Sequence, residues 1–91
     1  MSKAKIAKIR KEIDLADKHI ISALTTRFKL LNKIADFKSI NKIYDPQRER
    51  QILKNIKQEA IDNNLNPRFI KNLYLEILKE SKKQLKNILQ K

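Results

Sequence analysis

The chain has 91 residues and is strongly basic, with 22 lysines and arginines, ten aspartates and glutamates, and a net charge of +12. It contains no cysteine, which excludes disulfides and thiolate metal sites, and no glycine, on which the tight turns of β-hairpins depend. This composition predicts an all-α protein with a single small domain spanning residues 1–91.

A charge balance this basic is typical of proteins that bind nucleic acid or another anion. The lysines are spread over every segment and form no block or tail, which argues against a dedicated nucleic-acid arm. No run approaches the roughly 18 apolar residues of a membrane span. The charged start, Met1 to Lys5, is followed by no apolar stretch typical of a signal peptide. We therefore expect a soluble, cytoplasmic protein.

The first predicted element is one long helix over residues 6–37. At 1.5 Å per residue it would be roughly 50 Å long, whereas a compact domain of this size has a radius of gyration near 12 Å. The helix should therefore extend beyond its own domain and need a second chain to cover its apolar stripe, so we expect a homodimer. Two parallel rows with seven-residue spacings make up the stripe: Ile6, Ile13, Ile20 and Ile34, and Leu24 and Leu31.

Two further helices follow a predicted loop over residues 41–44. Asp45-Pro46 and Asn66-Pro67 are both typical helix starts, because Asp or Asn can cap free N–H groups and proline suits the first helical position. Residues 63–65, Asn-Asn-Leu, should end the second helix. The expected buried faces are Ile52, Leu53, Ile56 and Ala60 in the second helix, and Ile70, Leu73, Tyr74, Ile77, Leu78, Leu85 and Ile88 in the third.

Polar residues interrupt these apolar rows. Arg27 stands in the isoleucine row, and the parallel leucine row carries Arg10, Asp17 and Lys38. A buried charge costs several kcal/mol unless it is paired. The second and third helices carry two more such residues: Glu49 on the face of Ile52 and Ile56, and Ser81 in the row of Tyr74 and Ile88.

Two interpretations fit this pattern. In the structural one, Arg27 pairs with Asp17 and Lys38 with Glu49, which would fix the register of the helices. In the functional one, the inward cations, which outnumber the inward acids, form a pocket for a small anion. The single histidine, His19, falls beside the stripe and should be exposed. The sequence has no Ser/His/Asp set, metal cluster or glycine-rich phosphate loop, so an enzyme of this kind would need no nucleophile and no metal.

Five segments in order resemble the all-helical chorismate mutases. The resemblance runs from about Ile6 to Ser81, and the order and separations of the segments make it fairly specific. The segments are Ile-Arg-Lys-Glu-Ile-Asp at 9–14 followed by Asp17; Arg27 with Lys38; Tyr-Asp-Pro-Gln-Arg-Glu at 44–49; Leu-Asn-Pro at 65–67; and Ile-Leu-Lys-Glu-Ser at 77–81.

The resemblance implies an intertwined helical homodimer that rearranges chorismate to prephenate with no cofactor and no metal. The arginines and Ser81 would bind the two carboxylates of chorismate, and Lys38 would reach its ether oxygen. Glu49, with the backbone at Asp45, would hold the ring hydroxyl. One subunit would supply Arg27, Lys38, Asp45, Arg48, Glu49 and Ser81, and its partner would supply Arg10.

One position departs from the family pattern. The family places a glutamine four residues after the serine, as a second donor to the ether oxygen, whereas this chain has Leu85 there and Gln84 one residue earlier. The side chain of Gln84 should point roughly 100° around the helix from the expected direction. Either Gln84 substitutes by a local adjustment of the helix, or Lys38 acts alone and the mutase is weaker or assisted by a partner.

Three alternatives remain beside the mutase. The first is isochorismate pyruvate-lyase activity on the same fold, against which Glu49 argues because it matches the hydroxyl-binding position. The second is a weak mutase-like module that is regulated by a partner enzyme. The third is a non-enzymatic basic helical dimer that binds nucleic acid, which would explain the net charge but not the inward positions of Arg27, Lys38 and Glu49.

Overall fold

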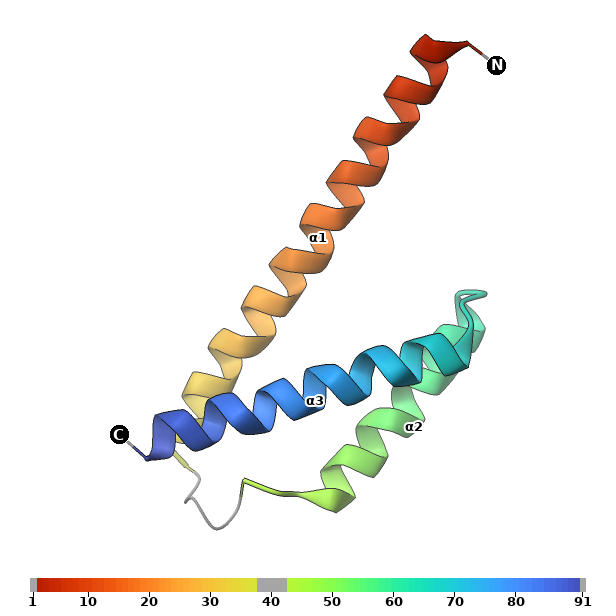
Figure 1. Ribbon diagram of the computed structural model, residues 1–91. Coiled ribbons are helices and arrows are strands. Elements are labelled where there is room, and N and C mark those ends of the chain that lie inside the picture. The colour runs from red at the N-terminus through yellow and green to blue at the C-terminus, as the bar shows by residue number, and fades with distance from the viewer. Residues whose placement is uncertain (1, 38–42, 91) are drawn as a thin grey trace. The chain divides into compact units, whose positions relative to one another are not determined.

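The computed structural model describes residues 2–37 and 43–90 and confirms an all-α protein. It contains α1 (Lys3–Ala35), α2 (Pro46–Asp62) and α3 (Pro67–Leu89), and the described residues include no strand (Figure 1). The chain divides into two compact units, Met1–Leu31 and Asn32–Lys91. The first holds most of α1, and the second holds its last turn together with α2 and α3. The expectation of one domain over residues 1–91 stays a prediction.

Helix α1 starts earlier and ends earlier than its apolar period indicated. It begins at Lys3, not Ile6, because Ser2 caps it: the Ser2 hydroxyl oxygen accepts a hydrogen bond of 3.2 Å from the Lys5 N–H. The residues between are polar or alanine, so hydrophobic spacing alone could not reveal them. The helix ends at Ala35, and Phe37, which was expected inside it, is 90% exposed.

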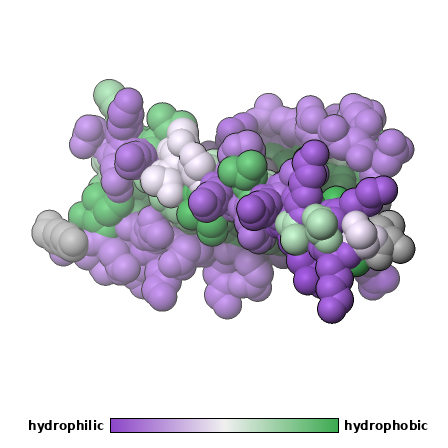
Figure 2. Space-filling model, turned by 90° about the horizontal axis from the view of Figure 1, so that it is seen from above, coloured by the Kyte–Doolittle hydropathy of each residue, from purple (hydrophilic) through white to green (hydrophobic). Residues whose placement is uncertain are grey.

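The apolar stripe of α1 is largely open to the surface. Ile13, Ile20 and Ile21 are 54%, 58% and 64% exposed. In Figure 2 apolar side chains are visible at the surface between the hydrophilic ones that dominate that face of the molecule. No helix within the described residues is both long enough and apolar enough to cross a membrane.

Helix α2 begins and ends as its sequence predicts. The Asp45 carboxylate accepts a hydrogen bond of 3.1 Å from the Arg48 N–H, and Pro46 occupies the first helical position. At the other end Asn64 has φ = 59°, and the Leu65 N–H donates to the Ala60 carbonyl at 2.8 Å. This left-handed C-terminal turn usually takes glycine or asparagine, so asparagine fills the position in a chain that lacks glycine.

Helices α2 and α3 pack against each other as an antiparallel pair, joined by the short connection over residues 63–66 (Figure 1). Asn66 caps α3 by accepting hydrogen bonds from the Arg68 and Phe69 N–H groups at 2.9 and 3.3 Å. The α3 helix continues to Leu89. Four apolar side chains of the pair are buried: Ile56, Ala60, Leu78 and Leu85.

Candidate active site

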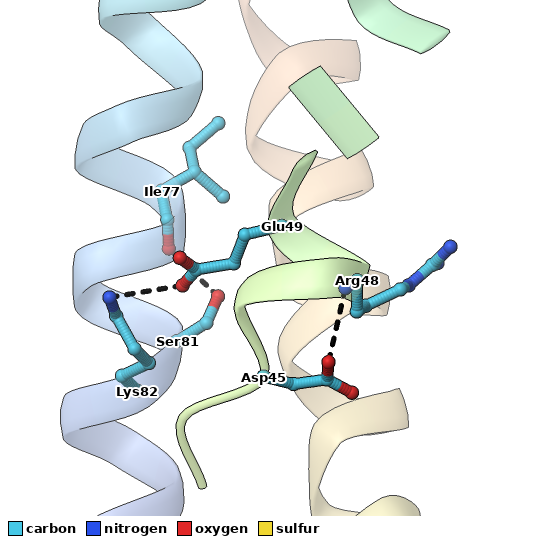
Figure 3. Close-up of polar contacts among 6 residues, drawn as sticks. All are labelled: Asp45, Arg48, Glu49, Ile77, Ser81 and Lys82. Atoms are coloured by element: carbon cyan, nitrogen blue, oxygen red, sulfur yellow. Dashed lines mark hydrogen bonds and ion pairs between the residues drawn. The ribbon is translucent and has the colours of Figure 1, made fainter. Parts of the chain in front are cut away.

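The antiparallel packing brings the start of α2 beside the end of α3, and two opposite charges meet there. The Lys82 Nζ lies 3.0 Å from the Glu49 Oε1, with the two side chains 37% and 23% exposed (Figure 3). Glu49 is in the first turn of α2, where a carboxylate is also stabilised by the helix dipole. The carboxylate expected to hold a substrate hydroxyl therefore sits in a half-buried ion pair.

The same lysine contacts an aromatic ring. The Lys82 Nζ lies 5.2 Å from the centre of the Tyr44 ring, within the range of a cation–π interaction. Tyr44 directly precedes the Asp45 cap of α2. Two attractions of different kinds, one to a carboxylate and one to a π face, thus hold the ammonium group at the entrance to α2.

Ser81 is the one polar residue among the buried side chains of the described chain, at 5% exposure. Its hydroxyl donates a hydrogen bond of 2.7 Å to the Ile77 carbonyl of the preceding turn, as helical serines often do (Figure 3). Its place between α2 and α3, toward Glu49, agrees with the inward position that the sequence indicated.

Asp45 and Arg48 lie on the other side of the same helix start. The Arg48 guanidinium donates to the Gln51 Oε1 at 3.0 Å, and its side chain extends away from Ser81 and Lys82 (Figure 3). Both residues are exposed and line a surface pocket along α2 with Gln47, Arg50, Gln51 and Lys54. In this structure the Arg48 guanidinium binds Gln51 and extends away from Ser81, so its predicted carboxylate-binding role stays a prediction.

The remaining predicted site residues lie in the first unit or outside the described residues. Arg10 is exposed and Arg27 half-buried on α1, in the first unit, and His19 is exposed as expected. Lys38 lies outside the described residues. The roles of Arg10, Arg27 and Lys38 in the site stay predictions.

The position of the missing family glutamine is a core position here. Leu85 is 4% exposed, whereas Gln84 is half-buried. The helix therefore presents the leucine, not the glutamine, to the interior of the second unit.

Lys82 is the site residue that sequence reasoning missed. The structural interpretation of the sequence paired Glu49 with Lys38, which lies outside the described residues. Within the described residues, Glu49 forms an ion pair with Lys82. Lys82 stands one residue after the Ser81 row, so helical spacing alone does not place it on the inward face. The signal that could have identified it was topological: in an antiparallel pair, the first turn of α2 must face the last turns of α3.

Chemically, the group offers hydrogen-bond acceptors and donors to a small polar molecule. Glu49 and Asp45 carry acceptors, and Lys82, Ser81 and Arg48 carry donors. Among residues 2–37 and 43–90, no three histidine, aspartate or glutamate side chains come together as a possible metal site.

The fold and the site define an all-helical protein whose charged side chains are held at helix ends by capping and ion pairing. The chain belongs to the chorismate mutase type II family, whose sequence profile matches residues 9–86. The matched stretch contains every residue of the predicted site.

Two curated relatives carry names from the same chemistry. The chain is similar to the bifunctional chorismate mutase/prephenate dehydratase of Buchnera aphidicola subsp. Schizaphis graminum (strain Sg), with 36% identity over 92 residues, covering 99% of this chain and 24% of the relative. It is also similar to a 4-amino-4-deoxychorismate mutase of Streptomyces pristinaespiralis, with 28% identity over 75 residues, covering 80% of this chain and 58% of the relative. The chain thus spans about a quarter of the first relative and somewhat over half of the second.

Proposed function

We propose that the chain is a chorismate mutase that rearranges chorismate to prephenate, without a covalent intermediate and without a metal or cofactor, in aromatic amino acid biosynthesis. The observation that carries the proposal is the meeting of Glu49 and Ser81 at one end of the α2–α3 pair, within a family match that covers residues 9–86.

The chemistry suits this set of residues because the rearrangement is intramolecular. An enzyme accelerates it by holding the extended substrate in its compact reactive conformer, which is a positioning effect. Negative charge develops on the ether oxygen, and a fixed cation stabilises that charge most strongly where water is excluded. We assign this role to Lys38. Arg27, Arg48 and Ser81 would hold the substrate carboxylates, and Glu49 with the Asp45 backbone would hold the ring hydroxyl.

Two local rearrangements would prepare the site. The Ser81 hydroxyl would turn from the Ile77 carbonyl toward a substrate carboxylate, and Arg48 would exchange Gln51 for the other carboxylate. The Ser81 exchange replaces a neutral hydrogen bond by a charge-assisted one, which is roughly twice as strong. The Arg48 exchange replaces a neutral amide acceptor by a carboxylate of opposite charge. The guanidinium fork suits a carboxylate because it can bind both oxygens.

We further propose that two copies form an intertwined homodimer in the cytoplasm and that each site takes Arg10 from the partner subunit. The exposed isoleucines of α1 support this arrangement. Burying one such side chain stabilises an interface by about 1.5–3 kcal/mol. A row of them, repeated on two copies, can hold a dimer together.

Turnover is the direct test. Purified protein incubated with chorismate should convert it to prephenate, followed as loss of the absorbance of the substrate and appearance of product. A bicyclic mimic of the compact transition state should bind saturably and inhibit. If chorismate persists and the mimic does not bind, the protein is not a mutase.

Subunit mixing tests the shared site. Arg10→Ala and Glu49→Ala homodimers should each be nearly inactive, because every site lacks one group. Refolding the two together forms mixed dimers with one intact site, so about one quarter of the wild-type rate should return at equimolar mixing. If no activity returns although mixed dimers form, Arg10 acts within its own subunit. An active Arg10→Ala homodimer would show that Arg10 has no part in the site.

A non-enzymatic nucleic-acid-binding dimer is the second candidate, and one surface favours it. A pocket between α2 and α3 is lined by five basic side chains and no acidic one: Arg50, Lys54, Lys57, Arg68 and Lys71, beside Leu53 and Pro67. A gel shift of duplex DNA that persists at moderate salt, and that weakens when Lys57 and Lys71 are changed to Glu, would support this function. Binding that disappears at moderate salt would leave only a non-specific attraction to a basic surface.

A further inference from the structure

We propose that Lys82 is a specificity-determining residue that makes this site prefer a substrate with a ring hydroxyl over one with an amino group at the same carbon. The inference rests on the proposed function, in which Glu49 receives that ring substituent. It concerns which of two related substrate classes the site prefers.

The geometry places a positive charge beside Glu49, the carboxylate proposed to bind the ring substituent. The Lys82 Nζ lies 3.0 Å from the Glu49 Oε1. Among the described residues, Lys82 contacts one of the two carboxylate oxygens of Glu49. In the proposed site the other oxygen accepts a hydrogen bond from the substrate. Since both side chains are more than half covered, the pair is screened less by water than a surface ion pair.

Tyr44 holds the ammonium group of Lys82 from another direction. The ring centre is 5.2 Å from the Lys82 Nζ, so the lysine keeps a favourable contact even while Glu49 shifts to receive a ligand. A lysine on an exposed helix face would swing into solvent at little cost. This one would leave a carboxylate and an aromatic face together.

The two substrate classes differ in the charge that they bring to this point. A hydroxyl donates one hydrogen bond to the second carboxylate oxygen of Glu49 and brings no charge for Lys82 to repel. A primary amine is largely protonated near neutral pH. An ammonium group competes with Lys82 for one carboxylate and is repelled by the lysine itself, because like charges a few ångströms apart repel strongly in a partly dry site.

One relative of this chain is named for a substrate of the second class. The Streptomyces pristinaespiralis relative is named a 4-amino-4-deoxychorismate mutase, so its substrate carries nitrogen where chorismate carries the ring oxygen. The same overall chemistry therefore exists with either substituent. The charge of Lys82 beside the Glu49 carboxylate can therefore discriminate between the two substituents.

The test measures kcat/KM for chorismate and for 4-amino-4-deoxychorismate with the full-length protein. Lys82→Met keeps the length of the side chain and removes its charge, and it should shift the ratio of the two values toward the amino substrate by about tenfold, equivalent to about 1.4 kcal/mol. Lys82→Arg keeps the charge and should keep the wild-type ratio. Lys83→Met, which removes a charge from an exposed position on the same helix, is the matched control and should also keep it.

A purely structural role for Lys82 would lower both kcat/KM values together and leave their ratio unchanged, which would overturn the inference. A wild-type protein that prefers the amino substrate would overturn it as well. If wild-type protein turns over neither substrate, the proposed function fails and this inference fails with it. Turnover of chorismate with an unmoved ratio removes this inference alone. Lys82→Gln provides a second uncharged variant if Lys82→Met does not fold, as judged by helical circular dichroism.

Discussion

Helix α1 and the α2–α3 pair differ in the exposure of their apolar side chains. The pair buries Ile56, Ala60, Leu78 and Leu85 within its own unit. On α1 the corresponding isoleucines stay exposed, with Ile20 at 58%. The pair is therefore specified by contacts that lie close in sequence. The first helix has an amphipathic pattern whose apolar face is covered only when another surface meets it.

The difference has a consequence for catalysis. The pair alone supplies Asp45, Arg48, Glu49 and Ser81, which are mainly groups for binding and orientation. In the proposed site the cations Arg10 and Arg27 come from α1, and Lys38 follows it in the chain. In this proposal, α1 depends on the dimer and also carries charges that the reaction needs. We therefore expect loss of the dimer to abolish activity before the α2–α3 pair unfolds.

We expect the largest effect on assembly and activity from a charge placed in the apolar stripe of α1. Ile20→Glu should give a monomer with no measurable chorismate turnover, because a buried unpaired carboxylate costs several kcal/mol in each copy. Sedimentation would report the mass, and a chorismate assay the rate. Lys18→Glu, a larger charge change nearly opposite on the helix, should leave the mass as in wild type. A dimeric, active Ile20→Glu protein would contradict the assignment of this stripe to the interface.

The next largest effect concerns the cation after α1. Lys38→Ala should lower kcat by about 10²–10³-fold, by analogy with the loss of one donor to a developing oxyanion. The dimer should persist, since the change removes charge and not apolar surface. Lys33→Ala in the last turn of α1, where the lysine is exposed, should leave kcat as in wild type. Near-normal turnover by Lys38→Ala would transfer the ether-oxygen role to another group.

Local sequence signals predicted most of the fold. The Asp45-Pro46 and Asn66-Pro67 starts are confirmed because capping depends on residues three positions apart at most. The start of α1 was placed too late because Ser2 caps a polar first turn that no hydrophobic period marks.

The site was harder to predict than the fold. Helical spacing identified Glu49 and Ser81 as inward residues, but it gives only the face on which a residue lies. The partner of Glu49 depends on how far α3 extends past the start of α2, which is a property of the packed pair. Helical periodicity therefore could not identify Lys82 as the partner of Glu49, because the chain contains many lysines and nothing in the sequence distinguishes this one.

A smaller effect is expected inside the pair, where the family glutamine is replaced by a leucine. Leu85→Gln should raise kcat about fivefold, since a new neutral hydrogen bond to the ether oxygen contributes about 1 kcal/mol. It should also lower the thermal midpoint, because Leu85 is 4% exposed and the amide would replace an apolar core contact. Gln84→Ala should leave kcat unchanged. If Gln84→Ala loses activity and Leu85→Gln gains none, Gln84 already serves as the second donor.

The smallest effect should come from the connection between the two helices of the pair. Asn66→Ala removes the acceptor that caps the Arg68 and Phe69 N–H groups and should cost about 1 kcal/mol of stability. Thermal or urea unfolding measures that cost, and Asn72→Ala, an exposed change inside α3, should be neutral or slightly stabilising because alanine favours helix. Turnover by the folded Asn66→Ala protein should equal that of wild type, because the cap lies at the end of the pair remote from Glu49 and Ser81. A loss of turnover without a loss of stability would mean that the far end of α3 influences the site, and the pair would then be less self-contained than its buried core indicates.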